Sequence, residues 1–353
     1  EYDIVVIGGG PTGFFSAILA KSKYNKKVAL IRKAEKAIIP CAIPYIYGTL
    51  KEVEKDLLPD DPLIKAGVDL IIDEVISIDR ENKIVKTAKG EEIKYEKLIL
   101  ATGSNPWLPP IKGIELAFPV FKDFKALEKL MKAINEANDI TIIGGGFIGV
   151  ELSEDLVKAG KKVRIIELLP HILQIAFDEE FCSLLEEKMK EKGIELITNT
   201  KVVEIKQKEN KKVVVLENGR EIETDLVIVA TGTRPNVNLA KESGLEVEKA
   251  IKVDERMRTS DQNIFAIGDC AEKRDFLTGK PKPIMLASVA CSEAIVAVEN
   301  LYEESNVKMK GVLGTFLTKF DNLVLGATGY TESNAKKEEI EVISGYFETV
   351  DKH

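Results

Sequence analysis

The stretch PCAIPYIYG holds a cysteine, Cys41, between two prolines, Pro40 and Pro44. A cysteine in so stiff a segment could fill a core, bind a metal ion or act as a nucleophile that exchanges electrons with a neighbouring group. The chain has three further cysteines, all distant from it: Cys182, Cys270 and Cys291. No C-x-x-C motif is present, which disfavours a zinc ribbon or a thioredoxin-type pair. The role of Cys41 therefore depends on the elements around it.

Two glycine-rich segments share one design. DIVVIGGGPTG and DITIIGGGFIG each join a β-branched run to an apolar stretch through G-x-G-x-x-G. In this motif the first glycine makes a tight turn, the second lets the backbone approach a pyrophosphate, and the third lets a helix pack on a strand. The helix N-terminus then presents free N–H groups to the anion. The motif glycines are Gly8, Gly10 and Gly13, and Gly144, Gly146 and Gly149.

The repeat continues downstream of both motifs. Each unit has a strand that ends in Ala-Thr-Gly, at residues 101–103 and 230–232. Alternating segments at residues 67–93 and 193–222 precede these strands and predict β-meanders, with turns at Glu81-Asn82 and Asn218-Gly219. The sequence therefore predicts an α/β protein with two nucleotide-binding units of similar plan.

A carboxylate follows the second unit at a strand end. The strand 264–267 ends at Gly268 and Asp269, where the aspartate can accept a hydrogen bond from a sugar-like hydroxyl. An ATG strand followed by a strand ending in GD resembles the pattern of two-dinucleotide flavoproteins, in which this aspartate holds the ribityl chain of FAD. The resemblance implies Rossmann-like domains of the three-layer ββα type, with FAD in the first unit and NAD(P)H in the second, which is inserted into the first.

The Cys41 segment also carries a resemblance. It is similar to the C-x-x-P-Y segment of the single-cysteine branch of the pyridine nucleotide-disulfide oxidoreductases, which includes NADH oxidases, NADH peroxidases, coenzyme A-disulfide reductases and persulfide reductases. The resemblance covers essentially the whole chain. It implies hydride transfer from NADH to FAD, then electron transfer to Cys41 and on to a thiol or disulfide acceptor or to O2. Cys41 would cycle through a sulfenic acid or a mixed disulfide.

The sulfur itself is expected to favour the thiolate. Cys41 should begin a helix after Pro40, and a helix N-terminus lowers the pKa of a thiol through its dipole and free N–H groups. Metal ligation is disfavoured because no second ligand of the right type lies nearby in sequence, so we expect no metal. Cys182 and Cys291 lie in helix-like stretches and are expected to be structural, and Cys270 is expected to be unreactive.

Motif and resemblance together give the candidate site. As catalytic residues we expect Cys41 and Glu151, the latter implied to lie near the nicotinamide and the flavin. The FAD-binding residues are expected to be Gly8, Gly10, Pro11, Thr12, Gly13, Arg32, Lys33, Val75, Ala101, Thr102, Gly103, Gly268, Asp269 and Ala287. The NAD-binding residues are expected to be Gly144, Gly146, Phe147, Ile148, Gly149, Glu167 and Gly232. For Phe147, gating of the nicotinamide and simple packing both remain open.

The residues after the second strand of each unit differ in charge. Glu167 can accept a hydrogen bond from the adenosine 2′-OH and repel a 2′-phosphate, which favours NADH over NADPH. Three nearby cations weaken that prediction: Lys161, Lys162 and Arg164. The first unit has Arg32, followed by Lys33, where an acid is expected. Glu35 could take over the ribose contact, Arg32 could contact the adenosine differently, or this could be a solvated basic turn.

The acceptor is less well defined. NADH peroxidases carry a histidine where this chain has Pro11 and Thr12, so peroxidase chemistry is disfavoured, and CAIPY looks closer to the coenzyme A-disulfide reductases. One alternative is a flavin reductase that serves an electron-transfer protein and has a structural Cys41. Another is a nucleotide-binding sensor without turnover.

Composition and length set the remaining expectations. A net charge of −8 argues against nucleic acid, no apolar run is long enough for a membrane span, and the N-terminus enters a strand at once, so we expect a cytoplasmic protein. The FAD domain is expected at residues 1–120 and 250–309, and the NAD domain at 121–249. Residues 310–353 look like the start of the family's α+β dimerisation domain, mostly absent here, which would make a homodimer.

Overall fold

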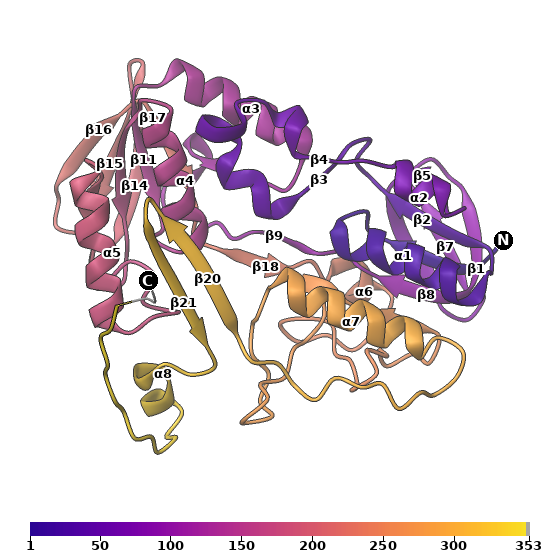
Figure 1. Ribbon diagram of the computed structural model, residues 1–353. Coiled ribbons are helices and arrows are strands. Elements are labelled where there is room, and N and C mark those ends of the chain that lie inside the picture. The colour runs from indigo at the N-terminus through magenta and orange to yellow at the C-terminus, as the bar shows by residue number, and fades with distance from the viewer. Residues whose placement is uncertain (351–353) are drawn as a thin grey trace.

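Two α/β lobes make up the computed structural model, which describes residues 1–350 (Figure 1). The first lobe contains a seven-stranded sheet in the order β5-β2-β1-β8-β7-β6, with β19 beside β8. Its strands are β1 (Tyr2–Ile7), β2 (Val28–Arg32), β5 (Asp69–Ile72), β6 (Val75–Asp79), β7 (Ile84–Thr87), β8 (Glu92–Leu100) and β19 (Ile264–Ala266). The β5-β2-β1-β8-β19 part is parallel, and β6-β7-β8 is the predicted meander.

The parallel strands of this lobe are apolar because both of their faces are covered. Ile4, Val5 and Val6 of β1 are fully buried. Helices α1 (Pro11–Tyr24) and α7 (Ala287–Glu299) pack side by side on the sheet, and the Tyr24 hydroxyl donates to the Val298 carbonyl at 2.7 Å. Segments about 280 residues apart in the sequence thus complete one core.

The second lobe repeats this plan with a five-stranded parallel sheet in the order β10-β17-β11-β12-β13. Its strands are β10 (Phe118–Pro119), β17 (Leu226–Val229), β11 (Asp139–Ile143), β12 (Lys162–Ile166) and β13 (Glu195–Ile197). The helices are α3 (Phe124–Glu136), α4 (Phe147–Lys158) and α5 (Glu179–Glu191), and the antiparallel meander consists of β14 (Val202–Lys208), β15 (Lys211–Leu216) and β16 (Glu221–Thr224). Sheet, helices and meander follow the order expected from the repeat.

Two short ribbons connect the lobes. Strand β9 (Ser104–Pro106), after the first ATG, pairs antiparallel with β18 (Thr233–Pro235), after the second ATG. A second ribbon, β3 (Ala37–Ile38) with β4 (Leu57–Leu58), carries the chain out of the first lobe and back. The chain therefore leaves the first sheet after β8 and returns to it at β19, which makes the second lobe an insertion.

The segment that contains Cys41 packs against the second lobe, although it follows β2 of the first. It forms the 3-10 helix η1 (Pro40–Tyr45), the π-helix η2 (Ile46–Leu50) and the 3-10 helix η3 (Val53–Asp56). Buried Ile43, Ile46 and Tyr47 join the hydrophobic cluster of α3 and α4. The Asp155 carboxylate of α4 accepts hydrogen bonds from the Gly48 N–H at 2.6 Å and the Thr49 hydroxyl at 2.5 Å.

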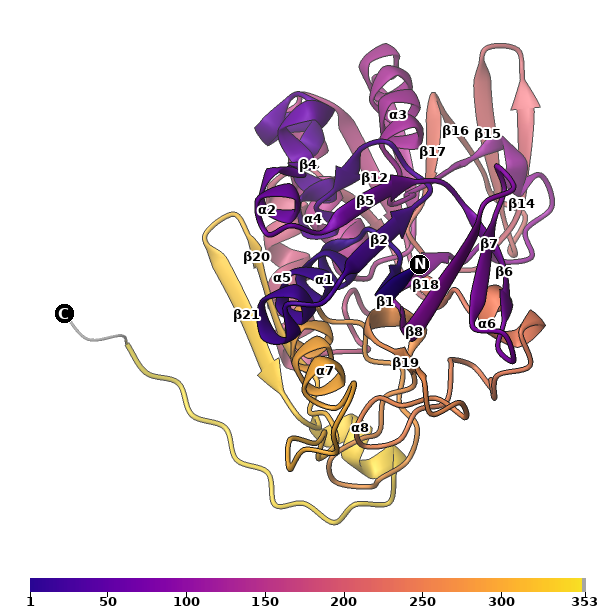
Figure 2. The same ribbon diagram turned by 90° about the vertical axis from the view of Figure 1, so that its right-hand side faces the viewer.

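The C-terminal part adds a hairpin to the second lobe. Strands β20 (Thr315–Phe320) and β21 (Leu323–Thr328) pair antiparallel, and Phe320 and Leu325 enter the cluster that contains α4. Helix α8 (Glu332–Lys337) follows, after which residues 341–350 run extended and exposed, away from both lobes (Figure 2). The remaining short helices are α2 (Asp61–Lys65), η4 (Ile114–Leu116), α6 (Asn238–Glu242) and η5 (Gly268–Cys270).

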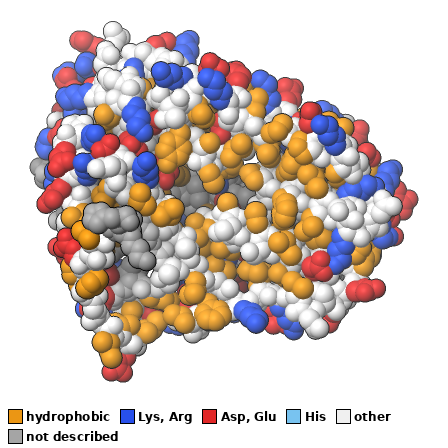
Figure 3. All heavy atoms as spheres, in the orientation of Figure 1, with side chains coloured by type: hydrophobic (Ala, Val, Ile, Leu, Met, Phe, Trp, Pro, Cys, Tyr) orange, Lys and Arg blue, Asp and Glu red, His pale blue; other side chains and the backbone are white. Residues whose placement is uncertain are grey.

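The face shown in Figure 1 is apolar at its centre. Hydrophobic side chains gather there around a hollow between the lobes, while charged side chains mark the rim (Figure 3). None of the helices in residues 1–350 has both the length and the apolar character needed to cross a membrane.

Candidate active site

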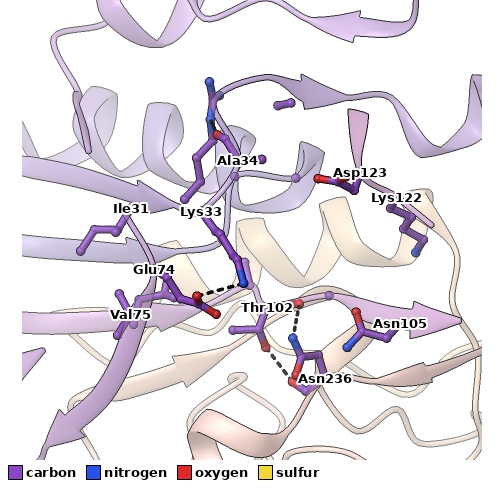
Figure 4. Close-up of a pocket in the computed structure, with 18 of the residues that line it drawn as sticks. Ile31, Lys33, Ala34, Glu74, Val75, Thr102, Asn105, Lys122, Asp123 and Asn236 are labelled. Atoms are coloured by element: carbon purple, nitrogen blue, oxygen red, sulfur yellow. Dashed lines mark hydrogen bonds and ion pairs between the residues drawn. The ribbon is translucent and has the colours of Figure 1, made fainter. Parts of the chain in front are cut away.

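A cavity of about 610 Å³ opens at the carboxyl ends of β1, β2 and β8 (Figure 4). This is where parallel α/β sheets bind ligands, and the volume is typical of a cofactor site. The expected FAD residues that line it are Gly8, Gly10, Arg32, Lys33, Val75, Ala101, Thr102 and Gly103. The other expected FAD residues, Pro11, Thr12, Gly13, Gly268, Asp269 and Ala287, lie outside its lining.

The first glycine motif forms a cradle with room for a phosphate. Gly8 has φ +115°, and a Cβ on it would overlap the Ala101 carbonyl, while one on Gly13 would overlap the Gly8 carbonyl. By contrast, no atom of residues 1–350 lies within 4 Å of a Cβ placed on Gly10, the N-cap residue of α1. The space at Gly10 leaves the free N–H groups at the start of α1 accessible, and the first turn has no acidic residue to repel an anion, which suits the pyrophosphate of FAD.

The second motif repeats this geometry closely. Gly144 has φ +114° and lies against the Ala230 carbonyl, and Gly149 lies against the Gly144 carbonyl. Gly146, at the start of α4, again has no neighbour within 4 Å of a Cβ in the described part of the chain. Two equivalent phosphate cradles are therefore present, one in each lobe.

Glu167 lies directly against the second cradle. One carboxylate oxygen accepts the Gly145 N–H at 2.5 Å, and the other accepts the Leu169 N–H at 2.7 Å. The three cations that weakened the coenzyme prediction all have other partners in this lobe. Lys161 donates to the Ala137 carbonyl, Lys162 pairs with Asp139, and Arg164 pairs with Asp139 and Glu195. The carboxylate of Glu167 therefore sets the charge at this end of the second site.

Arg32 occupies the corresponding place in the first lobe, and the interpretation of it as a solvated basic turn is wrong. The residue is only 4% exposed. Its guanidinium forms a bidentate pair with Asp60, at 2.5 and 2.7 Å, and also donates to the carbonyls of Ala34 and Glu35, while its aliphatic stem packs against Gly9. Arg32 thus holds the loop after β2 in place through contacts within the protein. Lys33 pairs with Glu74 at 2.9 Å on the cavity wall (Figure 4).

Asp269 is held as a carboxylate at the base of the same region. Ser104 Oγ donates to it at 2.7 Å and Lys122 Nζ at 2.8 Å. Burial alone would raise the pKa of Asp269, but the charge of Lys122 and these hydrogen bonds outweigh it, so the pKa is lowered. Ser104 and Lys122 line the cavity, which places the carboxylate next to it.

Cys41 is exposed, in the second position of η1, directly after the cavity-lining residue Pro40. The expected thiolate stabilisation is not found. The pKa of the Cys41 thiol is raised, first by loss of water around the sulfur and next by the charge of Glu151, while Lys122 acts in the opposite direction. Loss of water and the charge of Glu151 outweigh the stabilisation that was expected from the start of η1, which is only six residues long.

Glu151 lies on α4 and links Cys41 to the C-terminal hairpin. The Thr318 hydroxyl of β20 donates to Glu151 Oε1 at 3.0 Å. Burial raises the pKa of Glu151, while hydrogen bonds from Thr318 and Tyr45 lower it, and burial is the stronger effect. Burial and the Glu151 charge together raise the pKa of Tyr45 to about 12. The arrangement holds a carboxyl that can exchange a proton close to Cys41.

Phe147, at the start of α4, is packed from two sides. It stacks on Phe316 of β20 with ring centres 5.4 Å apart, and contacts Phe177 edge-on at 6.2 Å. These contacts favour the packing interpretation. Of the remaining cysteines, Cys182 and Cys270 are buried and Cys291 is exposed on α7.

Sequence reasoning missed several residues of the cavity wall and its support. Lys122 lies in the link to the second lobe, Asn236 follows β18, and Asp60 precedes α2. The Thr102 hydroxyl donates to the Asn236 carbonyl at 2.8 Å (Figure 4). None of these residues belongs to a motif, and only their neighbourhood in the folded chain connects them to the site.

Comparison with known proteins places the chain in a family of oxidoreductases. The family model described as pyridine nucleotide-disulphide oxidoreductase matches residues 2–294. The NADH oxidase of Methanocaldococcus jannaschii is 32% identical, and the CoA-dependent NAD(P)H sulfur oxidoreductase of Pyrococcus abyssi is 34% identical; both alignments cover 97% of this chain and 79% of the relative. The structure of an NAD-dependent persulfide reductase from A. fulgidus superposes with a TM-score of 0.89 at 32% identity, over 96% of this chain and 66% of that one.

Proposed function

We propose that Cys41 of this chain passes electrons from NADH and FAD on to a small sulfur acceptor. The premise is that the chain belongs to the pyridine nucleotide-disulphide oxidoreductase family and is a flavoprotein oxidoreductase that uses FAD and NADH. The family and the fold class inferred from the motifs are thereby confirmed. The acceptor class we propose is a persulfide or a disulfide of a thiol such as coenzyme A, with O2 as a slower acceptor. Support comes from the sulfur and NADH oxidoreductases among the relatives.

The residues of the first lobe fit FAD. The Gly8–Gly13 cradle and the start of α1 would hold the pyrophosphate, Val75 and Lys33 line the adenosine end of the cavity, and Asp269 would accept a ribityl hydroxyl. Bound FAD supplies the ability to accept a hydride from NADH and release two electrons to sulfur. The second cradle and Glu167 would bind NADH.

Cys41 would perform the sulfur chemistry. Its thiolate attacks one sulfur of R–S–S–R′, forms the Cys41–S–S–R bond and releases R′–S⁻. Two electrons from NADH then cleave the mixed disulfide and regenerate the Cys41 thiolate together with R–S⁻. One NADH is thus oxidised for each disulfide reduced. The sulfur is suited to this because it is exposed and lies next to the cavity wall at Pro40.

Glu151 would manage the proton. Because the pKa of the Cys41 thiol is raised, the sulfur needs a base before it can attack. Among the charged neighbours, Glu151 has the largest effect on the pKa of this thiol, and Thr318 and Tyr45 form hydrogen bonds with its carboxyl. Glu151 would accept the thiol proton and return a proton to the leaving thiolate.

A single observation carries the proposal: an exposed, free cysteine beside the FAD cavity, with a half-buried carboxyl, Glu151, whose charge acts on the thiol. The test compares Cys41→Ser with Cys291→Ser, which removes the other exposed thiol. We expect Cys41→Ser to retain FAD and its reduction by NADH but to lose at least 100-fold in turnover with coenzyme A disulfide or a persulfide. Cys291→Ser should match the wild type.

Other results would select other functions. Equal sulfur-reductase rates in Cys41→Ser and wild type would favour a reductase for an electron-transfer protein, with a structural Cys41. Turnover with O2 alone would identify an NADH oxidase. Failure of NADH to bleach the flavin absorbance of the wild type would leave a nucleotide-binding sensor.

We also propose that the enzyme works as a two-fold dimer. The β20–β21 hairpin packs on α4 through one face, while Leu317 and Val324 are 74% and 57% exposed on it. Most soluble oligomers are two-fold dimers, and an exposed apolar strand pair is a typical contact. Analytical ultracentrifugation of the wild type and of Leu317→Glu would test this, since the charge should shift a dimer toward monomer.

A further inference from the structure

A buried ion pair lies directly beneath the turn that carries Asp269. Lys273 is 5% exposed and Glu293 is 1% exposed, and their side chains meet at 3.2 Å. Lys273 follows η5 in the sequence, whereas Glu293 comes from the middle of α7. The pair therefore joins two parts of the first lobe that meet at the FAD region.

The pair forms hydrogen bonds with the backbone of the turn. A carboxylate oxygen of Glu293 accepts the Gly268 N–H at 2.7 Å, and Lys273 Nζ donates to the carbonyls of Gly268 and Ala271. Both polar backbone groups of Gly268 are thus fixed, in a residue that has φ +75°. Asp269 is the next residue, so the direction of its side chain depends on this turn.

Stability alone does not account for such a pair. Burying two charges costs desolvation free energy, and well-packed apolar residues often stabilise a core as much or more. The surroundings are suited to such residues, because Cys270, Ala294 and Ala297 are fully buried. What apolar side chains cannot supply is one acceptor for the Gly268 N–H and one donor for two carbonyls of the turn.

We propose that Lys273 and Glu293 are positioning residues for FAD, which fix the Gly268–Asp269 turn so that the Asp269 carboxylate faces the ribityl chain. This rests on the proposed role of Asp269 in holding FAD. Asp269 also receives Ser104 and Lys122 from the cavity wall. The ion pair therefore holds the backbone turn of Asp269, while Ser104 and Lys122 hold its side chain.

A pH dependence follows from the same geometry. Burial raises the pKa of Glu293 to about 7, against the opposing influence of Lys273 and the Gly268 N–H. The charged groups that face Glu293 are Lys273 and Asp269. Below pH 7 Glu293 gains a proton and its attraction to Lys273 weakens, so FAD affinity should fall between pH 8 and pH 6. Glu293→Gln should remove this dependence.

The decisive experiment separates folding from positioning. Lys273→Met alone strands a buried carboxylate and can prevent folding, so the key variant is the double replacement Lys273→Met/Glu293→Leu. FAD is removed and then titrated back, giving a Kd from flavin fluorescence, and the Tm of the FAD-free protein is measured in parallel. We expect the double variant to have a higher Tm than Lys273→Met alone, because no unpaired charge stays buried, but to bind FAD at least tenfold more weakly than the wild type.

Two controls complete the test. Arg164→Met breaks a buried ion pair of the second lobe, with Asp139 and Glu195, and should lower the Tm without changing the FAD Kd. Lys273→Arg keeps the charge and should retain most of the FAD affinity. A double variant with the wild-type FAD Kd would overturn the inference.

Asp269→Ala distinguishes the proposed role of Asp269 in FAD binding from the positioning role of Lys273 and Glu293. If it leaves the FAD Kd unchanged, the proposed role of Asp269 itself fails. If it weakens FAD binding while the ion-pair variants do not, only the positioning role of Lys273 and Glu293 is wrong.

Discussion

The two nucleotide units have the same backbone and different side chains at their ends. In both, the first motif glycine has φ near +115°, the third lies against the carbonyl of the first, and the middle one faces open space. After the second strand, however, the second unit places Glu167 on the cradle, and the first places Arg32 there. Arg32 is tied to Asp60 and two carbonyls, whereas Glu167 accepts one N–H group of the cradle, from Gly145, and one of its own loop, from Leu169.

This difference shows which parts of the site the backbone determines. Phosphate binding needs free N–H groups and space, and both units meet that need with glycines. Recognition of the sugar needs a side chain, and only the second unit leaves one available beside the cradle. In the first unit the side chain at this position is bound to Asp60, so we expect side-chain contacts to FAD from further along the chain, at Asp269 and Lys122.

The largest effect should come from the first glycine of each cradle. Gly8→Ala and Gly144→Ala combine a strained positive φ, worth about 1–3 kcal/mol, with overlap of a carbonyl, worth about 1–3 kcal/mol more. We expect Gly8→Ala to lose FAD. Gly144→Ala should retain FAD that dithionite reduces but NADH does not. Absorbance spectra of the purified variants measure both outcomes.

Gly90→Ala is the matched control, because Gly90 has φ +90° but no described atom within 4 Å of a Cβ. It should show the backbone strain alone. If Gly8→Ala and Gly144→Ala lost the same function, the assignment of one cofactor to each cradle would be wrong.

Arg32→Met tests whether the first unit has incorporated this position into the fold. The change removes a bidentate pair and two hydrogen bonds to carbonyls, and we expect it to cost about 2–4 kcal/mol in the free energy of unfolding. The stranded Asp60 is 31% exposed and can reach water, which limits the loss. Urea denaturation measures it. Arg32→Glu, which restores an acid at this place, should be at least as unstable, because it would face Asp60.

A third contrast concerns two fully buried aspartates, Asp56 of η3 and Asp155 of α4. Asp155 accepts two hydrogen bonds, whereas neither oxygen of Asp56 has a partner among residues 1–350. Burial raises the pKa of Asp56 to about 6 from 3.8. Its contribution to stability is therefore complete below pH 3.8 and is lost as the pH rises through 6, a change of about 3 kcal/mol at most.

Asp56→Asn should consequently match the wild type at pH 4 and exceed its stability at pH 7.5, by about 1–3 kcal/mol. Asp155→Asn should have the opposite sign at pH 7.5, because an amide nitrogen cannot accept the second hydrogen bond. Denaturation curves at both pH values decide the matter, and a destabilised Asp56→Asn at pH 7.5 would show that the carboxylate has a hidden partner.

The sequence was informative wherever a function depends on the backbone. Glycine spacing, the ATG strands and the GD turn identified both lobes, because each motif is needed for a local chain path, and the insertion followed from the family resemblance. The pKa of Cys41 could not be predicted, since it depends on Glu151, 110 residues away in the sequence. The same holds for Arg32, whose partner Asp60 belongs to no motif. Side-chain partners from distant segments become visible only once the lobes are folded.

The smallest effect, and the sharpest test of the contrast between the units, is expected at Glu167. Its carboxylate lies beside the Gly145 N–H, where a 2′-phosphate would bring a second negative charge next to it, while a 2′-OH could donate to it. Glu167→Ala should reduce the preference for NADH over NADPH in kcat/KM about tenfold, which is about 1.4 kcal/mol. Glu167→Gln removes the charge but keeps the shape, and its preference should fall between those of the wild type and Glu167→Ala. Glu191→Ala changes an exposed side chain on α5 and should behave as wild type. Steady-state kinetics with both coenzymes gives the ratio. A wild type that already uses NADPH as well as NADH would show that the second unit, like the first, does not read the ribose with this side chain.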